Sequence, residues 1–174
     1  MKNSTYVHKY LKNIITKDDV CVDMTMGNGN DTLFLLERAK YVYSFDIQEL
    51  ALINTKEKVK VYTNVKLIKD NHTNIDKYIN QKVKLFIFNL GYLPNSDSQI
   101  ITKKDDTLLA FKKAYDLLKD DGYIIMTFYL KHEGGLDEYY LLTEYFRNHN
   151  IKILDIYKER KKALEPITYI IKKF

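Results

Sequence analysis

The chain has 174 residues, of which 45% are hydrophobic and 29% are charged, and its formal net charge is +5 with a pI near 9.0. This composition excludes a disordered chain, and the length fits a single domain, residues 1–174, with a sizeable core. The positive charge allows an anionic partner such as RNA, but it fits a lysine-rich solvated surface equally well.

The single cysteine and the lengths of the apolar runs exclude several further classes. Cys21 alone cannot form an internal disulfide or a multi-cysteine metal site, and we expect no bound metal. No apolar run approaches the roughly 18 residues of a membrane span. The first residues, "MKNSTYVHKYLKNII", lack the apolar core of a signal peptide. We therefore expect a cytoplasmic protein with no membrane contact.

The first half of the chain alternates predicted helices and strands. Helical spacing of apolar residues predicts a helix over 4–16, with Ser4 or Thr5 as its N-terminal cap. A second helix, capped by Asp31 or Asn30, is predicted to run to about Ala39. Short β-branched and aromatic runs predict strands over 20–24, 41–47, 65–70 and 83–90, and the segments between them predict helices over 49–59 and 73–80.

The second half continues the alternation and then breaks it. A helix is predicted over 105–119 and ends at "DDG", and a strand over 123–130 and a helix over 136–149 follow. The strands 151–159 and 168–174 have no helix between them, so they should pair antiparallel. We predict an α/β fold with a mostly parallel seven-stranded sheet, helices on both faces and an antiparallel C-terminal strand.

Polar or glycine residues follow each predicted strand of the parallel sheet. Ligands of such sheets bind outside the carboxyl ends of the strands, so these residues form the candidate site. The candidates are, in chain order, Asp23, Thr25, Gly27, Asn28, Gly29, Asp31, Thr32, Asp46, Gln48, Asp70, Asn71, His72, Asn89, Leu90, Gly91, Tyr92, Tyr129, His132, Gly134 and Gly135.

The glycine loop "TMGNGND" and the next two strand ends together indicate an adenosine ligand. Thr32 stands where the dinucleotide fingerprint needs a third small residue, and the Gly-Lys-Ser/Thr of a phosphate loop is absent, which argues against NAD and nucleoside triphosphates. Asp46, assisted by Gln48, is placed to accept hydrogen bonds from both ribose hydroxyls, although it could instead cap a helix. Asp70 or the Asn71 amide would lie beside an adenine.

The strand end "NLGYLP" indicates an amine substrate. The Asn89 side chain and the Leu90 carbonyl could accept N–H bonds from an amine, and Tyr92 offers a face for a base or a cation. An ordinary turn, in which Asn and Gly suit the backbone angles, is the alternative.

Four motifs taken together resemble one known family. "DMTMGNGNDTLFL", "FDIQ", "FNLGYLP" and "HEGG" are similar in order to the motifs of class I S-adenosylmethionine-dependent methyltransferases. More narrowly, the chain resembles, over nearly its full length, the small bacterial family known as putative rRNA methylases. "NLGYLP" takes the place of the Asn-Pro-Pro-Tyr motif of amino-methylating enzymes. "KERKKALEP" departs from the family's Asn-Gln-rich segment.

The resemblance implies a Rossmann-like fold, S-adenosylmethionine as cofactor, and methylation of 5-aminomethyl-2-thiouridine at wobble position 34 of tRNA, bound through its anticodon stem-loop. The implied cofactor-binding residues are Asp23, Thr25, Gly27, Asn28, Gly29, Asp31, Thr32, Asp46, Gln48, Asp70, Asn71, His72 and Asn89. The implied substrate-binding residues are Leu90, Gly91, Tyr92, Tyr129, His132, Gly134 and Gly135, and the implied catalytic residues are Asn89, Tyr92 and His132.

An alkyl amine must lose its proton before it can accept a methyl group, because a reference pKa of about 10 leaves little free amine at pH 7. His72 and His132 are the candidate bases, and a structural hydrogen bond is the alternative for each. The "HEGG" loop and the basic stretch 158–162 should flank the RNA entrance, although the stretch could equally be a solvated loop.

Three other functions stay open from the sequence. They are an rRNA methyltransferase, a small-molecule amine N-methyltransferase and a non-catalytic adenosine-binding module. A homodimer is also left open, with no residue pattern that argues for it.

Overall fold

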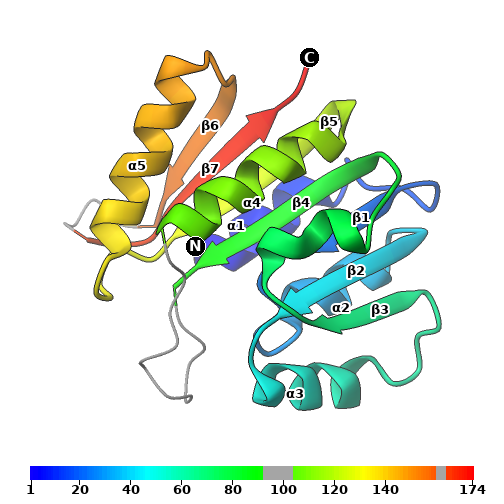
Figure 1. Cartoon of the computed structure of the whole chain (residues 1–174). Helices are drawn as coiled ribbons and strands as arrows, with labels where there is room; N and C mark the ends of the chain where they lie inside the picture. Colours follow the sequence, from blue (N-terminus) through cyan, green and yellow to red (C-terminus); the bar gives the residue numbers. More distant parts are fainter. Residues whose placement is uncertain (92–103, 160–163) are drawn as a thin grey trace.

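The computed structural model describes residues 1–91, 104–159 and 164–174, and its centre is a seven-stranded sheet in the order β3-β2-β1-β4-β5-β7-β6 (Figure 1). The strands are β1 (Val20–Asp23), β2 (Tyr41–Asp46), β3 (Val65–Lys69), β4 (Val83–Leu90), β5 (Leu118–Phe128), β6 (Ile153–Lys158) and β7 (Ile167–Lys172). The helices are α1 (Asn3–Leu11), α2 (Asn30–Leu36), α3 (Glu49–Val59), the 3₁₀ helix η1 (His72–Lys77), α4 (Lys104–Leu117) and α5 (Gly135–Asn148).

The strand directions confirm the predicted fold class. β1 pairs parallel with β2 and β4, and the same direction continues to β3 and β5. β7 pairs antiparallel with both β5 and β6. The chain runs outward from β1 to β3 and then crosses back to β4, so β1 and β4 flank the point at which the strand order reverses.

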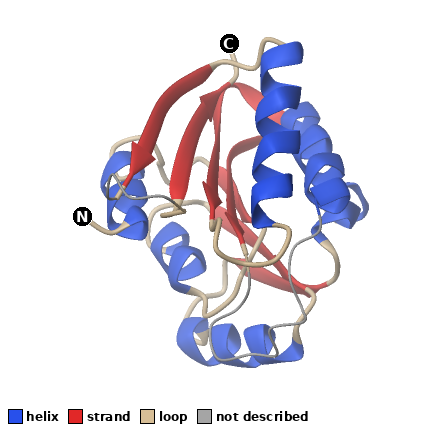
Figure 2. Ribbon diagram, turned by 90° about the vertical axis from the view of Figure 1, so that its left-hand side faces the viewer, coloured by secondary structure: helices blue, strands red, loops and turns tan. Residues whose placement is uncertain are grey.

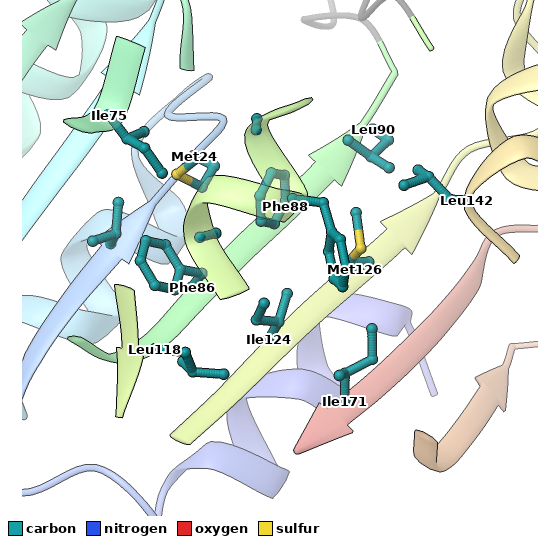
Figure 3. Close-up of a cluster of buried hydrophobic side chains, with 14 of the residues drawn as sticks. Met24, Ile75, Phe86, Phe88, Leu90, Leu118, Ile124, Met126, Leu142 and Ile171 are labelled. Atoms are coloured by element: carbon teal, nitrogen blue, oxygen red, sulfur yellow. The ribbon is translucent and has the colours of Figure 1, made fainter. Parts of the chain in front are cut away.

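Helices cover both faces of the sheet (Figure 2), and side chains that alternate along the strands supply a core to each face. On β4, Phe86 and Phe88 face the cluster formed with η1, α4 and α5 (Figure 3). Leu85 and Ile87 face the opposite cluster, formed with α1 and α2. Because β4 is buried on both faces, it reads as a continuous apolar run.

The N-terminal helix α1 packs against strands formed by the end of the chain. The buried amide of Asn3 donates a hydrogen bond to Thr168 Oγ1 at 2.8 Å. The Tyr6 ring stacks on Tyr157 at a centroid distance of 3.9 Å, and the Tyr6 hydroxyl bonds the Asp155 carboxylate. These contacts hold α1 across β6 and β7.

The predicted helix caps are wrong. α1 follows Lys2 and ends at Leu11, so Ser4 lies inside its first turn. α2 follows Gly29, whose φ of 71° is left-handed, and neither Asn30 nor Asp31 caps it. Asp31 does not cap because its carboxylate is bonded to side chains from two other elements, which a local cap signal cannot anticipate.

Two element boundaries also differ from the prediction. β5 begins at Leu118 rather than at residue 123, because the buried Leu118 pairs with Val83 ahead of a register irregularity. Asp121 adopts a φ of 65° within this stretch, and its carboxylate lies 2.9 Å from Lys84 Nζ. The segment predicted as a helix over 73–80 is the shorter 3₁₀ helix η1.

Within the three described ranges, no helix combines the length and the hydrophobicity that crossing a membrane requires. Cys21 is fully buried in β1, and burial raises the pKa of its thiol far above the usual range. Cys21 is therefore a core residue with no reactive thiolate.

Candidate active site

A cavity of about 920 Å³ opens at the carboxyl ends of the parallel strands, beside the switch point between β1 and β4. Open parallel sheets bind their ligands at this position. Twelve of the predicted residues line it: Thr25, Gly27, Asn28, Asp31, Asp46, Gln48, Asp70, Asn71, His72, Asn89, Gly91 and Tyr129. The structure thus brings residues from five separate strand ends to one cavity.

Asp46 ties the glycine loop to the end of β2. Its carboxylate accepts the Gly27 N–H at 2.9 Å and the Gln48 N–H at 3.0 Å. Gln48 is the residue before α3, and no side chain caps that helix. Because a carboxylate oxygen can accept more than one hydrogen bond, Asp46 can hold the loop and still offer acceptors to a ligand.

Gly29 does not line the cavity, and its lack of a side chain serves the packing of the chain itself. Its φ is 71°, and a Cβ built on it would lie 2.7 Å from Thr55 Oγ1 of α3. Gly27, with a φ of 53°, lines the cavity. Gly29 is therefore needed for close packing against α3, whereas Gly27 lies on the wall of the cavity.

Gly29→Ala should destabilise the fold more than Gly134→Ala. Both positions have a positive φ, which costs an alanine about 1–2 kcal/mol. At Gly134, however, a Cβ would meet nothing within 4 Å, whereas at Gly29 it would clash with Thr55. We expect the loss in free energy of unfolding, measured by urea denaturation, to be at least about twice as large for Gly29→Ala. Thr55→Ala should recover part of it; equal losses at the two glycines would contradict this account.

Asp23 and Thr32 hold the glycine loop from its buried side. Asp23 is fully buried and accepts the Thr32 hydroxyl at 2.7 Å and the Thr25 N–H at 3.1 Å. Thr32 Oγ1 also lies 2.8 Å from Ser44 Oγ. Burial, and next the nearby Asp31, raise the pKa of the Asp23 carboxyl. Neither Asp23 nor Thr32 lines the cavity, so their contribution is to fix the loop's shape.

Asn89 reaches the cavity from the end of β4 in a fixed orientation. Its backbone N–H donates to Thr25 Oγ1 and its side-chain Nδ2 donates to Asp31 Oδ2, each at 2.7 Å. Because a carboxylate only accepts, the amide must turn its NH₂ toward Asp31. Within the described part of the chain no hydrogen bond occupies Asn89 Oδ1, which remains an acceptor on the cavity wall.

His8 of α1 completes this group, and the sequence did not predict it. Its Nε2 lies 2.5 Å from Asp31 Oδ1, and its ring stacks on Phe34 at 4.0 Å. Asp31 therefore lies between His8 and Asn89, with one carboxylate oxygen toward each. The three residues come from α1, α2 and β4 and meet on one wall of the cavity.

The third strand end is mostly engaged in shaping its own turn. The Asp70 carboxylate accepts hydrogen bonds from the Asn74 amide, the Tyr78 hydroxyl and the Asn71 N–H. These bonds lower the pKa of the Asp70 carboxyl, and the bond from Asn74 has the largest effect. The Asn71 side chain caps η1 through the Thr73 N–H and donates to Asp106 Oδ2 at 3.1 Å. Both side chains line the cavity, but their described hydrogen bonds serve the fold.

His72 lies on the cavity wall as a neutral donor. Its Nδ1 lies 3.2 Å from the Met24 carbonyl oxygen, so Nδ1 carries the hydrogen. Burial lowers the pKa of this histidine, which makes it a weaker base.

Two predicted substrate contacts have partners within the protein itself. The Leu90 side chain is fully buried, and its carbonyl already accepts the Tyr129 N–H at 3.1 Å. His132 does not line the cavity, and its Nδ1 lies 2.8 Å from the Glu133 carbonyl oxygen. Sequence gives the position of a strand end but not the partners its backbone takes in the neighbouring strand.

Gly135, after β5, and Gly91, after β4, are explained by internal contacts, whereas Gly134 has open space where a Cβ would lie. A Cβ on Gly135 would lie 2.8 Å from the Tyr129 carbonyl oxygen, and one on Gly91 would lie 3.2 Å from Tyr129 Cβ. Gly91 and Tyr129 line the cavity, whereas Gly134 and Gly135 do not. Tyr92 and the basic residues 160–162 lie outside the described residues.

Ten further residues line the cavity without having been predicted. Most lie on helices, where amphipathic spacing marks a core face but not a functional one. They are Ser4, His8, Met24, Met26, Asn30, Leu33, Phe34, Glu37, Ile47 and Asp106. The two methionines belong to the quoted loop motif, and the contribution of α1 required the tertiary structure.

Comparison with known proteins gives a consistent result. Residues 42–172 match the model of the family described as "Putative rRNA methylase". The chain is 34% identical to a Streptococcus mutans structure described as a "putative methyltransferase" in complex with SAH, with a TM-score of 0.90 and coverage of 100% of this chain and 99% of that one. A "putative rRNA-methylase" from Clostridium thermocellum is 36% identical, with a TM-score of 0.91 and coverage of 100% and 99%.

One curated relative carries a more specific name. The tRNA (mnm(5)s(2)U34)-methyltransferase, chloroplastic, of Arabidopsis thaliana is 36% identical over 153 residues, which cover 79% of this chain and 56% of that protein. The chain thus spans about half the length of the curated relatives it matches.

Proposed function

The chain belongs to the Putative rRNA methylase family, and from this we propose that it is an S-adenosylmethionine-dependent RNA methyltransferase whose substrate is the aminomethyl group of 5-aminomethyl-2-thiouridine at position 34 of tRNA. The name of the Arabidopsis relative supports the wobble position, and the SAH in the Streptococcus structure supports the cofactor.

The cavity fits an adenosyl cofactor beside the glycine loop. Asp46 offers carboxylate acceptors for ribose hydroxyls next to Gly27 and Gln48. When bound, S-adenosylmethionine supplies a methyl group on a positively charged sulfur, and the chain's contribution is to bind, align and exclude water.

The proposal of an amine substrate rests on the orientation of the Asn89 side chain. Asp31 accepts from its Nδ2, which leaves Oδ1 as the side-chain atom that can accept an N–H group from a ligand in the cavity that Asn89 lines. An amine that donates one hydrogen to this oxygen keeps its lone pair free to be aimed elsewhere. A carbon nucleophile would gain nothing from such an acceptor, and this favours an N-methyltransferase.

The test is a nucleoside analysis of tRNA. In a deletion strain the methylaminomethyl nucleoside should disappear from total tRNA and its aminomethyl precursor should accumulate, as measured by mass spectrometry. The purified protein should methylate aminomethyl-bearing tRNA and leave unmodified tRNA unchanged, because an unmodified uridine offers no alkyl amine. An unchanged nucleoside profile in the deletion strain would refute the wobble assignment.

The family's name favours a second candidate, an rRNA substrate. Methylation of ribosomal RNA from the deletion strain, with tRNA unaffected, would select it. Methylation of the free aminomethyl-uridine nucleoside as fast as of tRNA would instead select a small-molecule amine methyltransferase.

Asp46→Ala should weaken SAH binding by about 1–3 kcal/mol through lost hydrogen bonds to the ribose. Calorimetry gives the affinity, and thermal unfolding of the free variant reports whether the loop held by Asp46 has loosened. Asp76→Ala is the matched control, since Asp76 pairs with Lys113 away from the cavity. Equal affinity in wild type and Asp46→Ala would remove Asp46 from the cofactor site.

A further inference from the structure

We propose that His8 is a positioning residue for methyl transfer: through Asp31 it fixes the side-chain amide of Asn89, so that the Oδ1 atom of Asn89 is kept for the substrate amine. The inference rests on the proposed function, in which Asn89 orients the amine. The sequence did not indicate His8, because this residue lies on α1, far from Asn89 at the end of β4.

The side chains of these three residues form a chain of hydrogen bonds with one direction. His8 Nε2 lies 2.5 Å from Asp31 Oδ1, and Asn89 Nδ2 donates to Asp31 Oδ2 at 2.7 Å. The carboxylate only accepts, so Nε2 carries the hydrogen of the first contact and the NH₂ group of Asn89 supplies that of the second. A neutral imidazole and a protonated one can both donate through Nε2, so this contact needs no change of charge on His8.

The amide of Asn89 has two possible orientations, and only one suits an amine. Rotation by half a turn exchanges the oxygen and the NH₂ group of an asparagine side chain. The backbone of Asn89 is held by the bond from its N–H to Thr25 Oγ1, so the rotation of the amide depends on Asp31. The opposite orientation would bring the amide oxygen against the carboxylate and offer the amine a donor in place of an acceptor.

His8 holds the Asp31 carboxylate through the oxygen that Asn89 does not use. Within residues 1–91, 104–159 and 164–174, His8 and Asn89 are the residues whose side chains donate to this carboxylate. The His8 ring is itself fixed, since it stacks on Phe34 at a centroid distance of 4.0 Å with 6° between the ring planes. The side chains of His8 and Asp31 are 28% and 14% exposed, so water could replace a lost bond only in part. Without His8, the carboxylate could turn toward another donor, and the Asn89 amide would lose its fixed partner.

Two substitutions of His8 separate the hydrogen bond from the ring packing. His8→Phe keeps a ring that can stack on Phe34 but has no N–H, whereas His8→Gln has no ring but keeps an N–H close to the position of Nε2. With aminomethyl-bearing tRNA, we expect kcat of His8→Phe to fall about tenfold to a hundredfold, the usual loss when the group that orients a metal-binding histidine is removed. His8→Gln should recover most of this loss, because glutamine can donate to Asp31 Oδ1.

His149→Phe is the matched control for these variants. His149 also stacks on an aromatic ring, that of Tyr145, at a centroid distance of 3.9 Å, but it does not line the cavity. This variant should therefore have the wild-type rate, which would show that exchanging a stacked histidine for phenylalanine does not by itself slow the enzyme.

A double-mutant cycle tests whether His8 acts through Asn89. Asn89→Ala leaves no amide to orient, so the addition of His8→Phe should lower kcat by less than about twofold further, as for residues of one hydrogen-bond network. Additive losses would mean that His8 affects the reaction independently of Asn89, and they would overturn the positioning role.

The hold on Asn89 can also be measured in the free protein, without tRNA or turnover. The NMR resonances of the Asn89 side-chain amide are identified by their absence from the spectrum of Asn89→Ala. Their exchange with water should be several-fold faster in His8→Phe than in wild type and close to the wild-type rate in His8→Gln, because hydrogen-bonded amide protons exchange slowly. Equal exchange in wild type and His8→Phe would show that Asp31 holds Asn89 without help from His8, which contradicts the proposal.

The outcomes separate this inference from the function on which it rests. A wild-type kcat in His8→Phe, or a His8→Gln variant as slow as His8→Phe, would overturn the positioning role and leave the methyltransferase function standing. Failure of the wild type itself to methylate aminomethyl-bearing tRNA would refute the proposed function and, with it, the part of His8 in that reaction. The exchange measurement would still report whether His8 fixes the amide of Asn89.

Discussion

Asn89→Ala should lower kcat by about a hundredfold to a thousandfold while it leaves the affinity for SAH nearly unchanged. The proposed role of Asn89 Oδ1 is to orient the amine as it attacks, and loss of one such oriented group typically costs this much. Single-turnover rates with aminomethyl-bearing tRNA measure the chemical step, and calorimetry measures SAH binding separately.

Two companion variants make the Asn89 result specific. Asn89→Asp should be as slow as Asn89→Ala, because it would place a second carboxylate against Asp31, 2.7 Å from the present amide nitrogen. Asn64→Ala removes an amide that bonds backbone carbonyls at the opposite edge of the sheet, and it should leave the rate unchanged. Near-wild-type turnover in Asn89→Ala would show that another group orients the amine.

The second large effect concerns the buried carboxyl of Asp23. Burial raises its pKa in the folded chain to about 7, whereas an unfolded aspartate titrates near 4. Between these values the folded state holds a proton that the unfolded state has released. Stability should therefore fall as pH rises from about 4 to about 7, with the full cost present above pH 7.

Asp23→Asn should remove this dependence. Its amide stays neutral at every pH, so the variant should gain stability relative to wild type as pH rises from 4 to 7, by on the order of a few kcal/mol. Urea denaturation at a series of pH values measures the difference in free energy of unfolding between the variant and wild type. The contributions of other titrating groups cancel in this difference, including that of Asp70, whose lowered pKa acts at more acidic pH. Parallel curves for the two proteins would show that Asp23 is ionised in the folded state.

The sequence was informative where the signal is local. Asp46 and Asn89 were predicted because they lie at the carboxyl ends of predicted strands, and parallel strands bring these ends to one edge of the sheet. The antiparallel end of the sheet followed from the short connection between the last two strands.

The errors arise where contacts join distant segments. Asp31 lies 23 residues from His8 and 58 from Asn89, so nothing in the local pattern marks the group that they form. The glycine at position 29 was attributed to a ligand, but its nearest obstacle is Thr55 of α3. The Leu90 carbonyl was predicted to accept an N–H bond from the substrate, and the local pattern did not show that it also accepts the backbone N–H of Tyr129.

The docking of α1 on the last strands sets the order in which the site can be completed during synthesis. α1 leaves the ribosome before β6 and β7, yet the side chains of Asn3 and Tyr6 have their partners on these two strands. Val7 and Leu11 are buried in a cluster to which β7 contributes Ile170, so this part of their cover forms only after β7 has been made. The glycine loop and Asn89 can fold before α1, which carries His8, has docked on β6 and β7. A nascent or truncated chain that lacks β6 and β7 would therefore have an undocked α1 with an exposed apolar face. Its cavity would lack the wall that α1 supplies.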